Sequence, residues 1–233
     1  MIVTDLDGTL LTTNKSITNY TLNVLQKFQA QGIILVIATA RSENMAIPYI
    51  KILKPDFIIY NNGSLAKDEK YIICEKLIPG NICYDFLQNC INNYKLKNIK
   101  VITQFGDFIN SVENIKDLFD FKYSDYNTFK YDAYKITIKT SDYIAHQLAM
   151  QYTSCSMFKF ENNNSFMFTD VNATKEIAVR KIAEWCNISM DDIVAFGNDL
   201  PDKEMLRICG TGVAVENACQ KVKDVANDIS FSN

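Results

Sequence analysis

The stretch that decides the fold lies at the start of the chain, where residues 1–11 read MIVTDLDGTLL. A short apolar stretch, residues 2–4, is followed by Asp5 and Asp7, and Gly8 comes directly after them. In open parallel sheets, ligands bind beyond the carboxyl ends of the strands. We therefore expect a short buried strand whose end presents two carboxylates to a ligand.

The residues that follow repeat an alternation of strand and helix. An amphipathic helix is predicted over 16–31, because Leu22, Leu25 and Phe28 recur at helical spacing. The other predicted elements up to residue 63 are a strand in 32–41 (GIILVIATAR), a helix over 42–53 and a strand in 57–63 (FIIYNNG). The strands are continuous apolar runs, which is typical of a parallel sheet covered on both faces.

The pattern changes in the middle of the chain and then returns to its first form. Helical stretches at 82–94 and 141–154 and strand-like stretches at 99–105, 133–140, 155–163 and 165–171 indicate a mixed α+β segment. Afterwards come a helix over 174–187, strands in 192–199 and 211–215, and helices over 201–209 and 216–226. We expect an α/β core with a parallel central sheet from residues 1–79 and 167–233, with an α+β domain inserted at 80–166.

Composition excludes several classes of function. The chain has 233 residues, a formal net charge of −3 and a pI of about 5.3, so the basic footprint of a nucleic-acid-binding protein is missing. No apolar run is long enough for a membrane span, and no signal peptide is recognised, so we expect a cytoplasmic protein. The seven cysteines form no C-x-x-C pair and are an odd number, which favours reduced thiols over disulfides or zinc.

The single histidine, His146, falls on a predicted helix and is more typical of a surface or core position than of a catalytic one. Polar residues instead follow four of the predicted strands. They are Asp5 and Asp7; Thr39 and Arg41; Asn61 and Asn62, with Gly63 beside them; and Asn198, Asp199 and Asp202. Lys175, at the start of a predicted helix, would project to the same edge. Carboxylates with one lysine and one hydroxyl suit a hard divalent cation that holds a phosphate.

Each of these pieces has an ordinary explanation when taken alone. An Asp-x-Asp-Gly-Thr run also describes a turn, Thr39 can be a helix N-cap, and Lys175 can be an exposed helix lysine. Their joint order along the chain, each at a strand end or a helix start, is what favours a site.

The same residues resemble those of a known family. DLDGTLL (5–11), VIATAR (36–41), the lysine of NATKEIAVRKI (172–182) and FGNDLPDKEML (196–206) are similar to the four motifs of the haloacid dehalogenase superfamily phosphatases. IIYNNGSL and GVAVENACQKVKDVANDI are similar to further signatures of the Cof-type group, subclass IIB. The resemblance implies a Rossmann-like core with an inserted cap domain of type C2B that lies over the catalytic edge of the sheet.

The resemblance also implies roles for individual residues. Asp5 would attack phosphorus and form an aspartyl-phosphate, and Asp7 would protonate the leaving alcohol and then activate water. Crowding by like charges would raise the pKa of Asp7, whereas a cation and Lys175 would lower it, so the net shift is left open. Thr39 and Lys175 would bind phosphoryl oxygens. The residues implied in substrate binding are Gly8, Ala40, Arg41, Asn62 and Gly63.

A Mg²⁺ cofactor is implied, with Asp5, Asp7 and the fourth-motif residues Asn198, Asp199 and Asp202 as candidate ligands. Here the chain departs from the family pattern. Alignment on Met205 and Leu206 places Asn198 where the family has a metal-binding aspartate. Either Asn198 binds the metal with one negative charge fewer, or Asp199 takes over, and the sequence leaves both open.

The resemblance implies a Mg²⁺-dependent phosphatase of small phosphorylated metabolites, with sugar phosphates as the first class. The expected partner is the substrate alone, without nucleic acid or membrane, and the expected state is a monomer or weak homodimer. A phosphomutase on the same scaffold and a degenerate phosphate-binding protein remain as alternatives. A signalling receiver is disfavoured, because Asp7 would hydrolyse the phospho-aspartate that a receiver must keep.

Overall fold

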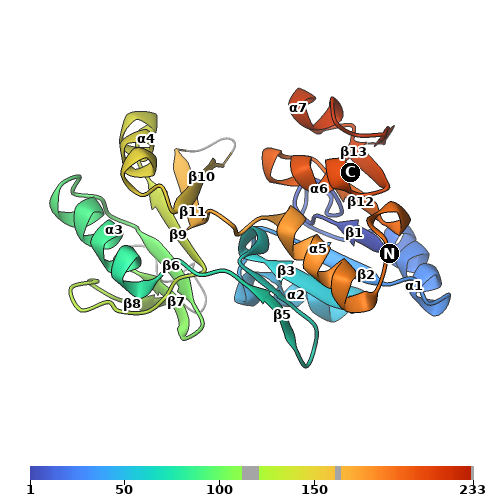
Figure 1. Cartoon of the computed structure of the whole chain (residues 1–233), viewed down its shortest axis with the longest axis horizontal. Helices are drawn as coiled ribbons and strands as arrows, with labels where there is room; N and C mark the ends of the chain where they lie inside the picture. The colour runs from blue at the N-terminus through green and yellow to red at the C-terminus, as the bar shows by residue number, and fades with distance from the viewer. Residues whose placement is uncertain (112–120, 161–163, 232–233) are drawn as a thin grey trace. The chain divides into compact units, whose positions relative to one another are not determined.

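The strand that ends before Asp5 lies inside a sheet of eight strands (Figure 1). The computed structural model describes residues 1–111, 121–160 and 164–231. The chain divides into a first unit, Met1–Glu75 with Thr174–Asn233, and a second unit, Lys76–Ala173. From the sequence, the inserted domain was predicted to end at residue 166. Strand β11 (Ser165–Asp170) crosses that point and pairs along its length with strands of the second unit.

The sheet of the first unit is mostly parallel, as predicted. Its strand order is β14-β13-β12-β1-β2-β3-β4-β5. The strands are β1 (Ile2–Thr4), β2 (Leu35–Ala38), β3 (Phe57–Tyr60), β4 (Leu65–Lys67), β5 (Ile72–Glu75), β12 (Val194–Gly197), β13 (Thr211–Val215) and β14 (Asp228–Ser230). The pairs from β14 through β3 are all parallel, whereas β4 and β5 form an antiparallel extension at one end. This hairpin was not predicted.

Helices cover the parallel strands. They are α1 (Asn19–Ala30), α2 (Glu43–Leu53), α5 (Lys175–Cys186), α6 (Lys203–Ile208) and α7 (Gln220–Lys223), with the 3₁₀ turns η1 (Asn61–Gly63), η3 (Met190–Asp192) and η4 (Leu200–Asp202). The core joins Val36 and Ile59 of the strands to Val179 and Ile182 of α5. Every residue of β2 and β3 is buried, as expected for strands that are covered on both faces.

Helix α5 begins where the sequence predicts, because Thr174 caps it. The Thr174 hydroxyl accepts a hydrogen bond from Ile177 N, which satisfies one of the free amides of the first turn. The helix ends at Asn187, whose left-handed conformation (φ 52°) stops the helical hydrogen bonding. The cap fixes the first residue of the helix, Lys175, at the end of the sheet where the site is built.

The second unit has a sheet of six strands in the order β10-β11-β9-β6-β7-β8. These are β6 (Lys100–Thr103), β7 (Gly106–Ile109), β8 (Phe121–Tyr123), β9 (Lys135–Lys139), β10 (Cys155–Lys159) and β11. All neighbours are antiparallel except β7 and β8. Helices α3 (Gly80–Asn92) and α4 (Asp142–Gln151) supply Phe86, Leu87 and Leu148 to its core. The predicted α+β character is therefore present, and residues 161–163 of one predicted strand lie outside the described residues.

Aromatic side chains of the second unit pack on one another. Phe108 stacks on Tyr131 at 5.9 Å between ring centroids, and Phe105 lies 4.9 Å from Tyr131. Phe129 meets Phe108 edge to face at 5.4 Å. Such pairs stabilise the unit beyond the area they bury.

Two compositional expectations can be compared with the structure. All seven cysteines are free thiols, and five of them are buried, as predicted. His146 lies exposed on α4, with its Nδ1 2.7 Å from the carbonyl oxygen of Asp142. Within the described residues, the longest apolar helices are too short to cross a membrane.

Candidate active site

Four neighbouring parallel strands end at one edge of the first unit's sheet. Their carboxyl ends lead into Asn198 after β12, Asp5 after β1, Thr39 after β2 and Asn61 after β3. Backbone hydrogen bonds continue the ladder past the strand ends, from Asp5 N to Phe196 O and from Thr39 N to Ile59 O. The polar residues singled out in the sequence therefore share one edge.

A buried ion-pair chain forms the centre of this edge. Lys175 Nζ lies 2.7 Å from Asp5 Oδ1 and 2.6 Å from Asp202 Oδ1. The side chains of Lys175, Asp5 and Asp202 are only 3%, 8% and 2% exposed. One cation is thus shared by two carboxylates, and the trio carries a formal charge of −1 out of contact with bulk water. Such an arrangement is costly unless its geometry is good or a further cation joins it.

Burial has opposite consequences for the two members of the central pair. Burial raises the pKa of Asp5 to about 7, and the charge of Lys175 opposes this shift without cancelling it. Burial alone would lower the pKa of Lys175, but Asp202 and Asp5 outweigh it and the pKa is raised. Lys175 is therefore a cation at neutral pH, and additional positive charge near Asp5 would favour its carboxylate form.

Asp7 has a different environment from Asp5. Arg41 Nε lies 2.6 Å from Asp7 Oδ2, while Arg41 Nη2 and Lys15 Nζ each lie 2.8 Å from Asp7 Oδ1. Partial burial would raise the pKa of Asp7, but the bonds and charges of Arg41 and Lys15 outweigh it and lower the pKa to about 2. The shift that the sequence left open is therefore downward in this state of the protein.

Glycine is required after Asp7. Gly8 has a φ of +82°, and a Cβ there would lie 2.6 Å from Asn198 Nδ2. The amide of Asn198 is held in place, because Thr9 Oγ1 donates to its Oδ1 at 2.9 Å. Asn217 also donates from Nδ2 to the carbonyl oxygen of Gly8. Asn198 therefore lies directly against the opening motif.

Asp199 and Asp202, which follow Asn198, accept hydrogen bonds from backbone N–H groups of their own loop. Asp199 Oδ1 accepts from Leu200 N and caps the turn η4. Asp202 Oδ2 accepts from Asn198 N at 3.0 Å and from Asp199 N at 3.1 Å, while its Oδ1 binds Lys175. Both oxygens of Asp202 are engaged by the protein, so Asp202 shapes the loop that presents Asn198.

Hydrogen bonds join the residues that follow β2 to the residues that follow β3. Thr39 Oγ1 accepts from Arg41 N, and Thr39 O accepts from Asn62 N. Asn61, Asn62 and Gly63 all have positive φ, of 49°, 63° and 108°. A Cβ on Gly63 would lie 2.3 Å from Thr174 backbone atoms, so this turn packs directly on the start of α5. Glycine takes this conformation without strain and asparagine tolerates it, so the residue types at 61–63 match the turn that the backbone makes here.

The donor atoms at this edge suit Mg²⁺. Asp5, the carbonyl of Asp7 and Asn198 offer oxygen atoms only, and Mg²⁺ takes few protein ligands and keeps several waters. The buried Oδ1 atoms of Asn61 and Asn62 have no hydrogen-bond partner within the protein. Among the described residues no group of three or more His, Cys, Asp and Glu side chains is arranged to hold a metal. A site here would therefore depend on one carboxylate, an amide oxygen, a carbonyl and water.

Sequence reasoning missed Lys15, Thr9 and Asn217. Their contacts depend on loops rather than on strand ends: Thr9 donates to Asn198, Asn217 donates to the carbonyl oxygen of Gly8, and Lys15 reaches Asp7 from a turn in which its own φ is 56°. Short-range patterns do not encode such turns at non-glycine residues.

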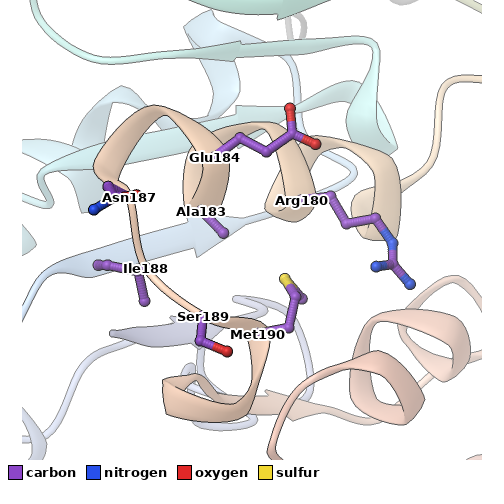
Figure 2. A pocket seen from close by; sticks show the side chains of 7 residues that line it. All are labelled: Arg180, Ala183, Glu184, Asn187, Ile188, Ser189 and Met190. Atoms are coloured by element: carbon purple, nitrogen blue, oxygen red, sulfur yellow. The ribbon is translucent and has the colours of Figure 1, made fainter.

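A separate pocket of about 460 Å³ lies in the first unit around the carboxyl-terminal half of α5 (Figure 2). It is lined by Arg180, Ala183, Glu184, Asn187, Ile188, Ser189 and Met190. Asn187 and Ile188 follow the last turn of α5, whereas Lys175 begins the first turn, about 18 Å away along the helix. The predicted site residues do not line this pocket.

Comparison with known proteins gives a consistent answer. The family model for haloacid dehalogenase-like hydrolases matches residues 2–233. A putative phosphatase of Buchnera aphidicola is 26% identical over 94% of this chain and 86% of its own. The Bacillus subtilis protein YcsE, a 5-amino-6-(5-phospho-D-ribitylamino)uracil phosphatase, is 25% identical over 100% of this chain and 90% of its own.

Solved structures share the fold. A sugar phosphatase of subclass IIB, BT4131, is 20% identical and superposes with a TM-score of 0.85 over 99% of this chain and 92% of its own. The two-part architecture expected from the sequence motifs is thus confirmed. The chain belongs to the haloacid dehalogenase-like hydrolase family, and it groups there with enzymes that are named as phosphatases.

Proposed function

We propose that this hydrolase is a Mg²⁺-dependent phosphatase of small phosphorylated metabolites that works through an aspartyl-phosphate on Asp5. The observation that carries the proposal is the buried chain from Asp5 through Lys175 to Asp202. It provides a carboxylate nucleophile beside a fixed cation at the edge where ligands of parallel sheets bind.

In the first step, Asp5 attacks phosphorus. Lys175 occupies Asp5 Oδ1, which leaves Oδ2 to form the new bond while the ester P–O bond breaks. Asp7, in its protonated form, gives a proton to the departing alcohol oxygen, and taking up that proton first requires the substrate to weaken the ion pairs with Arg41 and Lys15 that lower the pKa of Asp7. In the second step Asp7 accepts a proton from water, the water oxygen attacks phosphorus, and the Asp5 carboxylate is released with inorganic phosphate.

Other residues hold the phosphoryl oxygens. The Thr39 hydroxyl already accepts from Arg41 N, so its own hydrogen is left to donate to a phosphoryl oxygen. Lys175 supplies a second, charged donor. Because both groups are fixed before the substrate arrives, they stabilise the transition state without reorganisation. Asn62 and Gly63 support this arrangement by packing against the start of α5.

We assign the Mg²⁺ to Asp5, the backbone carbonyl of Asp7 and Asn198, with Asp199 and Asp202 reached only through water or a change of the loop. The bound cation would neutralise charge on the phosphoryl oxygens and favour the carboxylate form of Asp5. The buried Asp5–Lys175–Asp202 trio has a formal charge of −1, which supports an additional cation at this place.

The substrate class rests on relatives. YcsE is named for a phosphorylated ribitylamino compound, and the subclass IIB structure is described as a sugar phosphatase. A phosphorylated ribitylamino compound and a sugar phosphate are both phosphate esters of polyhydroxylated carbon chains. We propose that the substrate of this chain belongs to the same class. We also propose a cytoplasmic enzyme that acts as a monomer or weak homodimer.

A second candidate is a phosphate-binding protein without turnover. The presence of Asn198 at the metal position and the low pKa of Asp7 favour it, since both weaken the proposed chemistry. A phosphomutase on the same scaffold would transfer the phosphoryl group back to a sugar rather than to water.

Hydrolysis of p-nitrophenyl phosphate with and without Mg²⁺ separates these candidates. We expect turnover that depends on Mg²⁺ and that the Asp5→Asn substitution abolishes. The control variant His146→Ala, which changes an exposed residue of α4, should keep the wild-type turnover. Turnover that survives in Asp5→Asn would disprove the nucleophile. Phosphate binding without any hydrolysis would support the second candidate, and exchange between sugar mono- and bisphosphates would support the phosphomutase.

A further inference from the structure

Two cations share one carboxylate beside the nucleophile. Arg41 and Lys15 both bond to Asp7, so the three side chains carry a formal charge of +1. This cluster stands apart from the buried Asp5–Lys175–Asp202 chain, because its members reach solvent. One cation more than Asp7 requires is therefore present at the rim of the site.

The two cations are held very differently. Arg41 grips both oxygens of Asp7, donates from Nη1 to Met45 O, and lies 4.6 Å from the centre of the Tyr49 ring. Its side chain is only 18% exposed. The bidentate Arg41 pair is sufficient to hold the Asp7 carboxylate in place.

Lys15 is the exchangeable member of the cluster. Its side chain is 54% exposed, and the ion pair that it makes within the described residues is the one with Asp7 Oδ1. Exposed pairs of this kind contribute little to stability. Lys15 can therefore leave Asp7 for another anion at small cost, whereas Arg41 cannot.

The backbone turn that contains Lys15 places its side chain next to Asp7. Residues 12–16 form a closed turn, with bonds from Lys15 N to Thr12 O and from Thr12 N to Ser16 O. The hydroxyls of Thr12 and Ser16 lie 2.8 Å apart and brace the turn. Lys15 itself takes the left-handed conformation (φ 56°), which is uncommon for a residue other than glycine and is held here by the hydrogen bonds of the turn.

We propose that Lys15 is a specificity-determining residue that binds a second anionic group, on the leaving part of the substrate. The inference rests on the proposed function, in which Asp7 meets the ester oxygen. Since Lys15 Nζ lies 2.8 Å from Asp7, an anionic group a few bonds beyond that oxygen comes within its reach. The favoured substrates are then phosphate monoesters of alcohols that also carry a carboxylate or another phosphate.

The test compares matched substrates. 3-Phosphoglycerate and glycerol 3-phosphate differ by a carboxylate in place of a hydroxymethyl group, so the ratio of their kcat/KM values isolates the second anion. We expect the wild type to prefer 3-phosphoglycerate by about tenfold, the effect of one charge-assisted hydrogen bond. We expect Lys15→Asn, which keeps a residue that tolerates positive φ, to bring the ratio close to one.

Two controls define the result. Lys15→Arg keeps the charge and should keep the preference, and Lys27→Asn, on the exposed surface of α1, removes the same charge elsewhere in the unit and should not alter the ratio. A wild-type ratio near one, or an undiminished ratio in Lys15→Asn, would overturn the assignment while leaving the phosphatase intact. If the protein hydrolyses neither of the two esters and also fails to hydrolyse p-nitrophenyl phosphate, both proposals are overturned.

Discussion

Lys175 and Asp5 are 170 positions apart in the sequence, yet their side chains form a 2.7 Å ion pair that is almost fully buried. The pair exists because β1 ends beside the capped start of α5, and Asp202 completes it from the other side. Asp5, Lys175 and Asp202 come from three separate sequence motifs. The pair therefore links folding of the first unit to assembly of the catalytic edge.

Replacing Lys175 with Met should strongly destabilise the protein. The substitution leaves Asp5 and Asp202 buried without a cation, and breaking a buried pair in this way costs about 3–5 kcal/mol. Urea unfolding at neutral pH measures the loss. Lys181→Met, which removes an exposed pair with Glu184, is the matched control and should change stability by less than about 0.5 kcal/mol. Equal effects of the two variants would show that the buried pair does not stabilise the fold.

Gly63→Ala should damage the site through its backbone. A Cβ at Gly63 would lie 2.3 Å from the backbone of Thr174, the cap of α5, so the helix start and Lys175 must move. Gly32 has a similar positive φ of 81°, but open space surrounds its Cβ position. Gly32→Ala should therefore cost only the conformational strain, about 1 kcal/mol, and should retain activity. Thermal unfolding and p-nitrophenyl phosphate hydrolysis of both variants measure the difference.

The parts of this fold that could be predicted from sequence are those with strong local signals. Strands β2 and β3 could be predicted from their continuous apolar runs, and helix α1 from the helical spacing of its apolar residues. The hairpin of β4 and β5 was missed, because its strands have three and four residues and β5 is partly exposed at the sheet edge. The last helix was predicted over 216–226 but is only Gln220–Lys223.

The shortening of α7 has a physical reason in the site. Asn217 donates to Gly8 O and Cys219 N donates to Asn198 O, so residues that could continue the helix instead tie two loops of the site together. The pairing of Asp7 with Lys15 was beyond sequence reasoning for a similar cause. It depends on a closed turn at 12–16 and not on strand order. Strand ends place residues at one edge, whereas loop hydrogen bonds decide which of them touch.

Asn198→Asp should lower the Mg²⁺ concentration needed for half-maximal activity. Asn198 lies against Gly8 and accepts from Thr9, and a carboxylate in its place can keep that bond while adding one negative charge for the metal. We expect a decrease of about tenfold, equivalent to roughly 1.4 kcal/mol of metal binding. Metal titration of p-nitrophenyl phosphate hydrolysis gives the value.

Asp199→Ala is the control for this assignment. Asp199 caps η4 through Leu200 N, so its loss should cost about 1 kcal/mol of stability and should leave the Mg²⁺ requirement unchanged. A large rise in the Mg²⁺ requirement of Asp199→Ala alone would instead make Asp199 the metal ligand and Asn198 its neighbour.

The stability of the second unit should depend on pH through Lys135. This lysine is buried in β9, and burial lowers its pKa to about 8, although the charge of Asp107 opposes the shift. In the unfolded chain a lysine keeps its proton up to a pH of about 10.4. Between these two values the unfolded state binds more protons, so this group makes the free energy of unfolding rise with pH, by up to about 3 kcal/mol.

The measurement is urea unfolding at several pH values from about 7.5 to 10, for the wild type and for Lys135→Met. Thiol and phenol groups that titrate in this range are common to both proteins, so the difference between the two curves isolates Lys135. The wild type should gain stability relative to Lys135→Met as the pH rises through 8. Parallel curves would mean that the ammonium of Lys135 keeps an ordinary pKa, with its charge compensated inside the second unit by Asp107.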